Sequence, residues 1–241
     1  MLIEHRVYTL APGAEASFWD AQRERGEEGL RPILERLIGT YAARSGATDQ
    51  IVSLYRYDSF EDWQTRLFGV YRQAALQPYF RAVRPLIRHQ ESRFLAPAPL
   101  PELTPHWGNG RDWLPAHGPL FASSRAESVM DELTLTFAAG GVPACWEAMA
   151  RHALTDDAAI MTGLCAGFST IAGALNQVLL YWRHPNLEGA LHHRSRLRKS
   201  ARWNDFLRKL APVDIHAESR MLAPSTVADM SPLYANDGTI F

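Results

Sequence analysis

The sequence repeats itself at a constant spacing. Residues 46–52 read GATDQIV and residues 173–179 read GALNQVL, while residues 91–97 read ESRFLAP and residues 218–224 read ESRMLAP. The separation between Gln50 and Gln177 equals the separation between Glu91 and Glu218, since 177 − 50 and 218 − 91 give the same value. We call this separation the repeat spacing. One spacing shared by separate segments predicts a duplicated module, so we expect two related halves rather than one irregular domain.

The composition is that of an ordinary globular protein. The 241 residues are 46% hydrophobic and 21% charged, and this is enough chain for two domains. A net charge of −1 favours neither nucleic acid nor an anionic membrane as a partner. No apolar run is long enough to span a membrane, and charged residues near the N-terminus replace the apolar core of a secretion signal. We therefore expect a cytoplasmic protein with no membrane span.

The first 97 residues alternate between strand and helix patterns. The predicted elements are a strand at 2–10, a helix at 14–37, strands at 40–44 and 50–57, a helix that begins after Ser59, and a strand at 91–96. Gly26, Gly29 and Pro32 predict a break or kink within the first helix. The order strand, helix, strand, strand, helix, strand is that of the split βαβ, or ferredoxin-like, fold. It predicts an α+β module in which a four-stranded antiparallel sheet has both helices on one face.

A diverged second copy follows a connector. Residues 98–129 are rich in Pro and Gly, which predicts an ordered connector. The second copy has predicted strands at 132–137, 163–171, 177–184 and 215–222, and predicted helices at 142–154 and 186–210. In this alignment Glu132 takes the place of Glu4. The predicted domains are therefore a module at 1–97, a connector at 98–129, a second module at 130–224 and a tail at 225–241.

Three stretches of the first module resemble the NIPSNAP family. Residues 4–13 (EHRVYTLAPG) resemble the family's opening Glu-x-Arg-x-Tyr-x-Leu-x-Pro-Gly, and residues 85–93 (PLIRHQESR) are similar to its closing strand. Residues 49–57 (DQIVSLYRY) resemble the core pattern Asn-Gln-Val-x-His-Leu-Trp-x-Tyr, except that Ser53 stands where the family usually has His. The resemblance covers residues 1–97 well and residues 130–224 more faintly.

The resemblance implies a dimeric α+β barrel, in which two antiparallel ferredoxin-like sheets face each other with their helices outside. The duplication allows one chain to supply both sheets, as an intramolecular pseudo-dimer. The alternative, or an addition, is pairing between chains in a homo-oligomer. The family's biochemical role is poorly defined, so the resemblance does not identify a substrate.

On this architecture, one face of each sheet is expected to line the barrel interior. The candidate catalytic residues on that face are Glu4, Arg6, Tyr8, Glu91 and Arg93. The candidate ligand-binding residues are Tyr55, Tyr57, Glu132, Trp182, His184, Glu218 and Arg220. Carboxylates and arginines in a confined cavity can bind a polar ligand or act in acid–base chemistry, whereas the alternative is that they form structural ion pairs. The aromatic side chains either line a pocket for a flat apolar ligand or pack in the core.

No motif in the sequence implies a metal or an organic cofactor. Cys145 and Cys165 are not at a metal-binding spacing, and Glu188 with His192 on one predicted helix makes only a two-residue ligand set. Phosphate-binding glycine loops and nucleophile elbows are also missing from the sequence. Two functions stay open. One is cofactor-independent oxygenase- or isomerase-like chemistry on a small hydrophobic or aromatic ligand, and the other is a non-catalytic binding or scaffold role of the outer surface.

Overall fold

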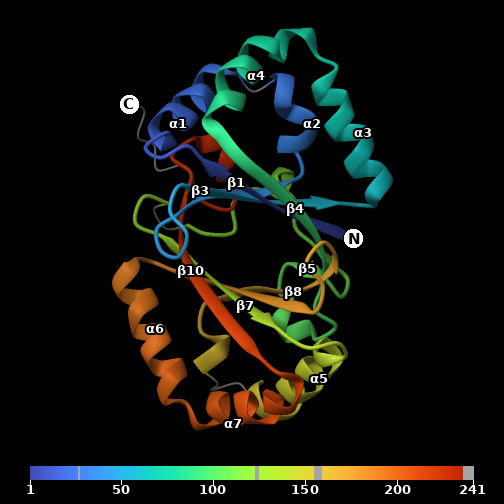
Figure 1. The fold of residues 1–241 in the computed structure, drawn as a ribbon, viewed down its shortest axis with the longest axis vertical. Coiled ribbons are helices and arrows are strands. Elements are labelled where there is room, and N and C mark those ends of the chain that lie inside the picture. Colours follow the sequence, from blue (N-terminus) through green and yellow to red (C-terminus); the bar gives the residue numbers. More distant parts are fainter. Residues whose placement is uncertain (27, 123–124, 155–158, 236–241) are drawn as a thin grey trace. The chain divides into compact units, whose positions relative to one another are not determined.

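The computed structural model describes residues 1–26, 28–122, 125–154 and 159–235. The chain forms two compact units, each of mixed helix and strand (Figure 1). Unit 1 contains Met1–Phe94, the described parts of Leu114–Ala126 and residues 222–235. Unit 2 contains Leu95–Trp113 and the described parts of Glu127–Met221. The predicted tail at 225–241 is described as far as residue 235, and the rest of it lies outside the described part of the chain.

Unit 1 is a sheet with helices α1 to α4 over one face (Figure 1). Its elements are β1 (Leu2–Leu10), α1 (Glu15–Glu24), α2 (Arg31–Leu34), β2 (Leu37–Ala43), β3 (Gln50–Tyr57), α3 (Phe60–Tyr71), α4 (Gln77–Val83) and β4 (Ile87–Pro97). The strand order is β4-β1-β3-β2. The break predicted within the helix at 14–37 is confirmed, since Gly26 has a left-handed φ of 70° between α1 and α2. The predicted end of this helix is wrong, because Leu37 already pairs with Tyr55 as the first residue of β2.

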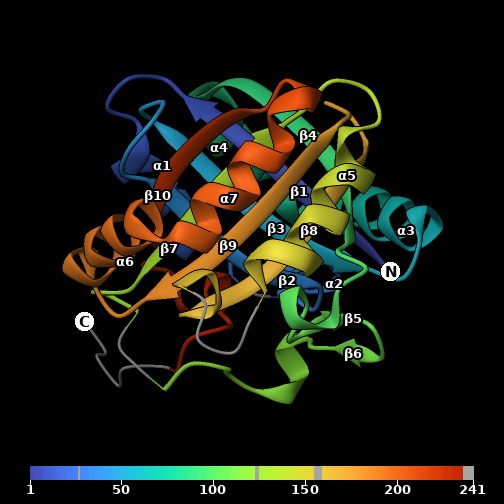
Figure 2. The same ribbon diagram turned by 90° about the horizontal axis from the view of Figure 1, so that it is seen from below.

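Unit 2 has the same kind of sheet, with α5, α6 and α7 over one face (Figures 1 and 2). Its elements are β5 (Trp107–Gly108), β6 (Arg111–Asp112), β7 (Val129–Thr136), α5 (Gly141–Ala148), β8 (Leu164–Ala172), β9 (Gln177–His184), α6 (Leu187–Lys199), α7 (Ala201–Leu210) and β10 (His216–Pro224). The long helix predicted at 186–210 is two helices. Ser200 has extended backbone between them, and its side chain accepts a hydrogen bond from the Trp203 amide at 3.3 Å, which starts α7.

In unit 2 the hydrogen-bonded strand order is β10-β7-β9-β8. The last residues of β10 pair with β2 inside unit 1, through Leu222 and Ala43. The short strands β5 and β6 form a separate two-stranded sheet. Among the described residues, none of the helices combines the length and the hydrophobicity that a membrane span requires.

Backbone details recur at the repeat spacing. The sheet of unit 1 has an irregular register between Leu37 and Gly39 of β2, and the sheet of unit 2 has one between Leu164 and Ala166 of β8. The turns that follow these strands have left-handed residues at matching places, and the matching pairs are Gly46 with Gly173 and Asp49 with Asn176. Short polar residues such as Asp and Asn tolerate this conformation best after Gly. The sequence repeat is therefore also a repeat of local backbone geometry.

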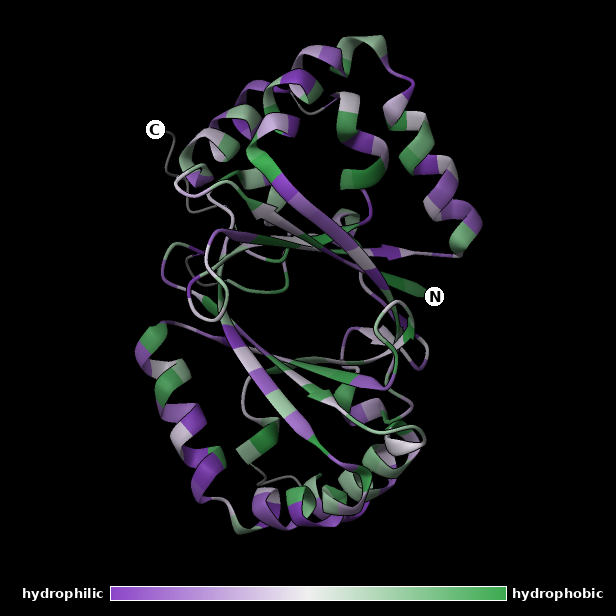
Figure 3. Cartoon of the chain, in the orientation of Figure 1, coloured by the Kyte–Doolittle hydropathy of each residue, from purple (hydrophilic) through white to green (hydrophobic). Residues whose placement is uncertain are grey.

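Each unit has its own hydrophobic core between its sheet and its helices. In unit 1 the helical residues Phe18, Val70 and Phe80 pack with sheet residues such as Ile51. In unit 2 the helical Trp146, Leu197 and Phe206 pack with sheet residues Leu135 and Val178. The helices carry both hydrophobic and hydrophilic residues (Figure 3), as expected for helices that cover a sheet with one side and face solvent with the other.

The N-cap residues that precede α3 and α6 provide a test of the repeat. The Ser59 hydroxyl accepts a hydrogen bond from the Asp62 amide at 3.1 Å, and the Asn186 side chain accepts one from the Gly189 amide at 2.8 Å. We predict that Ser59→Ala and Asn186→Ala each lower the free energy of unfolding by about 1 kcal/mol, because each leaves a helix amide without its cap. Urea denaturation measures the change. The exchanged caps Ser59→Asn and Asn186→Ser serve as controls and are expected to retain wild-type stability; a loss as large as that of the alanine variants would contradict the capping role.

Candidate functional site

The candidate residues of β1 and β3 lie on the face of the sheet that the helices cover. Glu4 pairs with Tyr55 across the two strands, and Arg6 and Tyr8 follow Glu4 on the same face. Tyr8, Tyr55 and Tyr57 belong to the core that includes residues of α1, α3 and α4. The prediction that these side chains face away from the helices is wrong. Its physical cause is that β1 is buried on both faces, so alternation alone does not indicate which face the helices cover.

A buried ion pair lies at the centre of this face. Arg6 donates from Nε to Glu4 Oε1 at 3.0 Å and from Nη2 to Glu4 Oε2 at 2.8 Å, and both residues are at most 4% exposed. The Ser92 hydroxyl also donates to Glu4 Oε1, at 2.8 Å. The Arg6 guanidinium lies over the Tyr55 ring at 4.9 Å. Glu4 is therefore satisfied by its neighbours, as a buried carboxylate must be.

One end of the Arg6 guanidinium faces a small cavity. The cavity has a volume of about 90 Å³, is partly open, and is lined by Arg6 and by aromatic residues of the sheet and helices, including Tyr8, Phe18, Tyr55, Tyr71, Tyr79 and Phe80. Arg6 Nη1 makes a long contact of 3.4 Å with the Tyr8 hydroxyl. Burial opposes the charge of Arg6, but its acidic neighbours Tyr8 and Glu4 outweigh burial and raise the pKa of Arg6. The cavity therefore presents a permanent cation at one side.

Three tyrosines that line this cavity, Tyr55, Tyr71 and Tyr79, stay protonated at neutral pH. Burial raises the pKa of Tyr79 to about 12 and raises the pKa values of Tyr55 and Tyr71 as well. They therefore offer neutral hydroxyl groups rather than phenolates. No carboxylate or imidazole is among the described residues that line the cavity, so these residues provide no general base next to a ligand.

The other candidates of the first half do not join this cluster. Arg93 Nε donates to His5 Nδ1 at 3.3 Å, which places Arg93 with the odd-numbered residues of β1 rather than with Glu4 and Arg6. Glu91 has a side chain that is 65% exposed and lies 3.6 Å from His89. The structure thus divides the predicted set: Glu4, Arg6 and Tyr8 come together, while Arg93 and Glu91 lie elsewhere.

In unit 2 the predicted alignment is displaced by one residue. Asp131 pairs with Trp182 as Glu4 pairs with Tyr55, so Asp131, not Glu132, takes the place of Glu4. A shift of one residue moves a strand side chain to the opposite face. Glu132 consequently accepts from Tyr181 Oη at 2.7 Å and from Arg220 Nε at 2.8 Å.

The remaining candidates of the second half are divided in the same way. Trp182 belongs to the helix-covered core, with its Nε1 donating to the Ile160 carbonyl at 2.6 Å. Glu218 is 74% exposed, and its carboxylate is 3.2 Å from His216. The predicted ligand set of unit 2 is therefore not one site.

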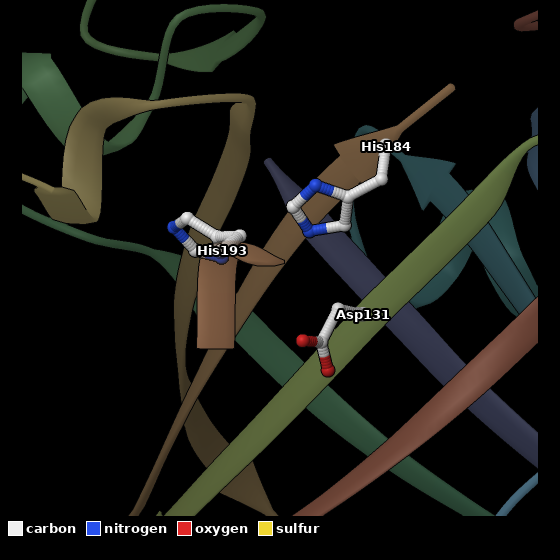
Figure 4. Close-up of side chains that lie close together, drawn as sticks. All are labelled: Asp131, His184 and His193. Atoms are coloured by element: carbon white, nitrogen blue, oxygen red, sulfur yellow. The ribbon is translucent and has the colours of Figure 1, made fainter. Parts of the chain in front are cut away.

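A buried cluster on the helix-covered face of unit 2 was not predicted as a group. Asp131 of β7, His184 of β9 and His193 of α6 have one side-chain nitrogen or oxygen each within 4.8 Å of the others (Figure 4). Arg194 holds Asp131 through two hydrogen bonds of 2.6 and 2.8 Å, and Asp131 raises the pKa of Arg194 in turn. Burial, and then the neighbouring His193, lower the pKa of His184 to about 4, so both imidazoles are neutral at neutral pH. The repeat spacing applied to Glu4 would have indicated Asp131.

The buried pair of unit 1 can be tested by removing its charges singly and together. We predict that Glu4→Gln or Arg6→Met alone lowers the free energy of unfolding by about 3 kcal/mol, because each leaves one buried charge without its partner. The double variant Glu4→Gln/Arg6→Met is expected to lose less than the sum of the two, by about 1 kcal/mol or more. A double-mutant cycle from urea denaturation measures the coupling. Strict additivity would contradict a compensated pair.

The chain matches one protein family twice. The NIPSNAP family model matches residues 3–101 and residues 130–228, and the two matches begin one repeat spacing apart. No curated protein matches the chain. A solved NIPSNAP-like domain protein from Burkholderia xenovorans is 29% identical, and the match covers 41% of this chain and 86% of that one with a TM-score of 0.39.

Two other solved structures match nearly the whole chain. A candidate monooxygenase from Lactobacillus acidophilus is 12% identical over 93% of this chain and 94% of its own, with a TM-score of 0.56. An anthrone oxidase-like protein is 10% identical over 92% and 90%, with a TM-score of 0.54. At these identities the likeness is one of fold alone. The family model covers most of the sequence in two copies, which confirms the resemblance seen in residues 4–13, 49–57 and 85–93, and the chain belongs to the NIPSNAP family.

Proposed function

We propose that the protein binds a small hydrophobic or aromatic molecule that carries an oxygen acceptor, in the cavity of unit 1. The observation that carries this proposal is the position of Arg6, a buried cation at the side of an aromatic-lined cavity. Its Nε and Nη2 are held by Glu4, whereas Nη1 makes only the long contact with Tyr8 among the described residues. A ligand oxygen at Nη1 completes the hydrogen bonding of the guanidinium.

The size of the cavity limits which part of a ligand enters it. A volume of about 90 Å³ is smaller than the roughly 150 Å³ cavity that accommodates benzene in an engineered protein. The oxygen-bearing end of the ligand therefore reaches Arg6, and the rest stays at the open side against apolar residues such as Ile33 and Leu67. A carboxylate, phenolate or carbonyl group attached to an apolar body fits this description.

The chemistry that we infer is stabilisation of negative charge on the ligand oxygen. A fixed guanidinium in a desolvated cavity favours an enolate or phenolate over its neutral form. Oxygenase-like chemistry without a cofactor starts from such an anion, and proteins with this fold include a candidate monooxygenase and an anthrone oxidase-like protein. Isomerase-like chemistry needs a base, which the described lining does not offer. We therefore favour binding, followed by oxygenase-like chemistry when the ligand ionises on its own.

We also infer that the two units arose as tandem ferredoxin-like modules, at 1–97 and 130–224, with 98–129 as the connector. The matching registers, turns and helix caps at one spacing support this inference. The charged cavity site then belongs to the first module, because Leu133 and Leu135 stand where Arg6 and Tyr8 stand in the first (133 − 6 and 135 − 8 both equal the repeat spacing).

Benzoate and toluene test the role of the cation, because they share a ring and differ in the oxygen acceptor. We predict that the wild-type protein binds benzoate about 10-fold or more tightly than toluene, since a hydrogen bond to a charged group contributes about 1.5–3 kcal/mol. The variant Glu4→Gln/Arg6→Met, in which no buried charge is left unpaired, is expected to lose this preference. Titration calorimetry or ligand-observed NMR measures both affinities.

A cavity-filling variant is the matched control for this experiment. Val70 lines the cavity from α3 and is 1% exposed, so Val70→Phe is expected to weaken both probes while leaving Arg6 in place. If benzoate and toluene bind the wild type equally, or if benzoate binds the double variant as well as the wild type, the proposed role of Arg6 is wrong.

The alternative is a non-catalytic scaffold role of the outer surface, and one observation favours it. Helix α3 exposes two large aromatic side chains, Phe60 at 48% and Phe68 at 43%. Exposed aromatic residues are typical of surfaces that contact other proteins. If Val70→Phe leaves the cellular role of the protein intact and Phe60→Ser/Phe68→Ser abolishes it, the scaffold function is the right one.

A further inference from the structure

A second site, independent of the cavity in unit 1, lies on the helix-covered face of unit 2. Asp131, His184 and His193 come from β7, β9 and α6, and each is at most 4% exposed. Figure 4 shows the three side chains lying close together. One nitrogen or oxygen from each residue lies within 4.8 Å of the other two.

Two ring nitrogens in this cluster are buried and have no hydrogen-bond partner among the residues that the structure describes. They are His184 Nε2 and His193 Nδ1. Leaving a buried polar atom unpaired costs about 1–3 kcal/mol, so such atoms usually have a role that the protein alone does not fill. Packing does not explain them, because an apolar residue would fill the same space without this cost.

The hydrogen bond of His193 determines which of its nitrogens can accept a ligand. His193 Nε2 lies 2.9 Å from the Ala159 carbonyl oxygen, which can only accept a hydrogen bond. The proton of the neutral ring is therefore on Nε2, and Nδ1 presents its lone pair. A histidine that donates one N–H to a backbone carbonyl and offers the other nitrogen is typical of metal ligands.

We propose that Asp131, His184 and His193 bind a divalent transition-metal ion such as Zn²⁺ or Co²⁺. Two imidazoles with one carboxylate suit these ions, whereas Mg²⁺ and Ca²⁺ need a set of oxygen ligands. A ligand distance of about 2.0–2.2 Å requires donor atoms at most about 4 Å apart, so the 4.8 Å cluster closes by small side-chain rotations.

Arg194 limits the metal affinity of this site. Its guanidinium occupies both carboxylate oxygens of Asp131, at 2.6 and 2.8 Å. Each carboxylate oxygen has a second lone pair for a metal, but the positive charge of Arg194 opposes a second cation nearby. Arg194 therefore competes with a metal ion for the Asp131 carboxylate, and removal of Arg194 is expected to strengthen metal binding.

Unit 1 provides an internal comparison. At the repeat spacing, Glu4, Tyr57 and Arg66 stand where Asp131, His184 and His193 stand in unit 2 (131 − 4, 184 − 57 and 193 − 66 are equal). The shared fold thus does not require imidazoles at these positions. The ligand set belongs to unit 2 alone, and any metal bound by the chain at these positions is expected in a ratio of one ion per chain.

Direct titration of the full chain tests the proposal. The chain is first stripped with a chelator and then titrated with Co²⁺, followed by displacement with Zn²⁺. We expect one Co²⁺ to bind per chain and to give a visible absorption spectrum typical of nitrogen ligands. We also expect the nitrogen chemical shifts of the His184 and His193 side chains to change on metal binding. Because this measurement uses the unmodified protein, failure of a variant to fold does not affect it. The absence of Co²⁺ and Zn²⁺ binding, as expected if a buried water bridges the two imidazoles instead, would overturn the proposal.

Three variants identify the ligands. His193→Gln is expected to weaken binding by at least about 100-fold, more than the loss of an outer-shell partner usually costs. The adjacent exposed histidine provides the control, since His192→Gln is expected to bind as the wild type does. Arg194→Gln is expected to tighten Zn²⁺ binding about 10-fold and to gain more thermal stability from Zn²⁺ than the wild type gains. Equal affinities in the wild type and His193→Gln, or weaker binding in Arg194→Gln, would show that this cluster is not the site.

Discussion

The arrangement of both units depends on a buried carboxylate between the sheet and the helices. Glu4 and Asp131 take the same position, and a charge removed from water needs a partner of opposite sign and complete hydrogen bonding. Unit 1 supplies the partner from the same strand, since Arg6 is two residues after Glu4. Unit 2 supplies it from a helix, since Arg194 belongs to α6. The source of the arginine decides what else each unit can hold beside its carboxylate.

This difference separates the two candidate sites. In unit 1, Arg6 lies among tyrosines on the helix-covered face of the sheet, and it lines a small cavity. In unit 2, the position of Arg6 is taken by Leu133, and the space near the carboxylate is shared by His184 and His193. A duplicated fold has thus kept one buried acid in each copy and surrounded it with different chemistry. One arrangement favours an anionic or carbonyl ligand, and the other favours a metal ion.

Much of the local structure could be predicted from the sequence. The bounds of β1 and β3 at 2–10 and 50–57, and of β9 at 177–184, agree with the alternation of residues, and Ser59 does begin the helix that follows it. Strand bounds and helix caps depend on neighbours a few residues away in the chain, so the local sequence pattern is enough to predict them. The faces of the strands could not be predicted in the same way. Alternation identifies two sets of residues, but when both sets are buried it does not say which set meets the helices.

The sequence by itself determined the duplication, its constant spacing, the order of strands and helices, and the presence of a buried acid with a nearby arginine in the first half. Only the tertiary structure decided that Glu4 and Arg6 face the helices, that Glu132 lies on the opposite face from Asp131, and that Asp131, His184 and His193 meet. The physical reason is that these contacts join side chains from separate strands and helices. Their meeting depends on strand register and on which face each helix covers, and a change of one residue in register reverses both.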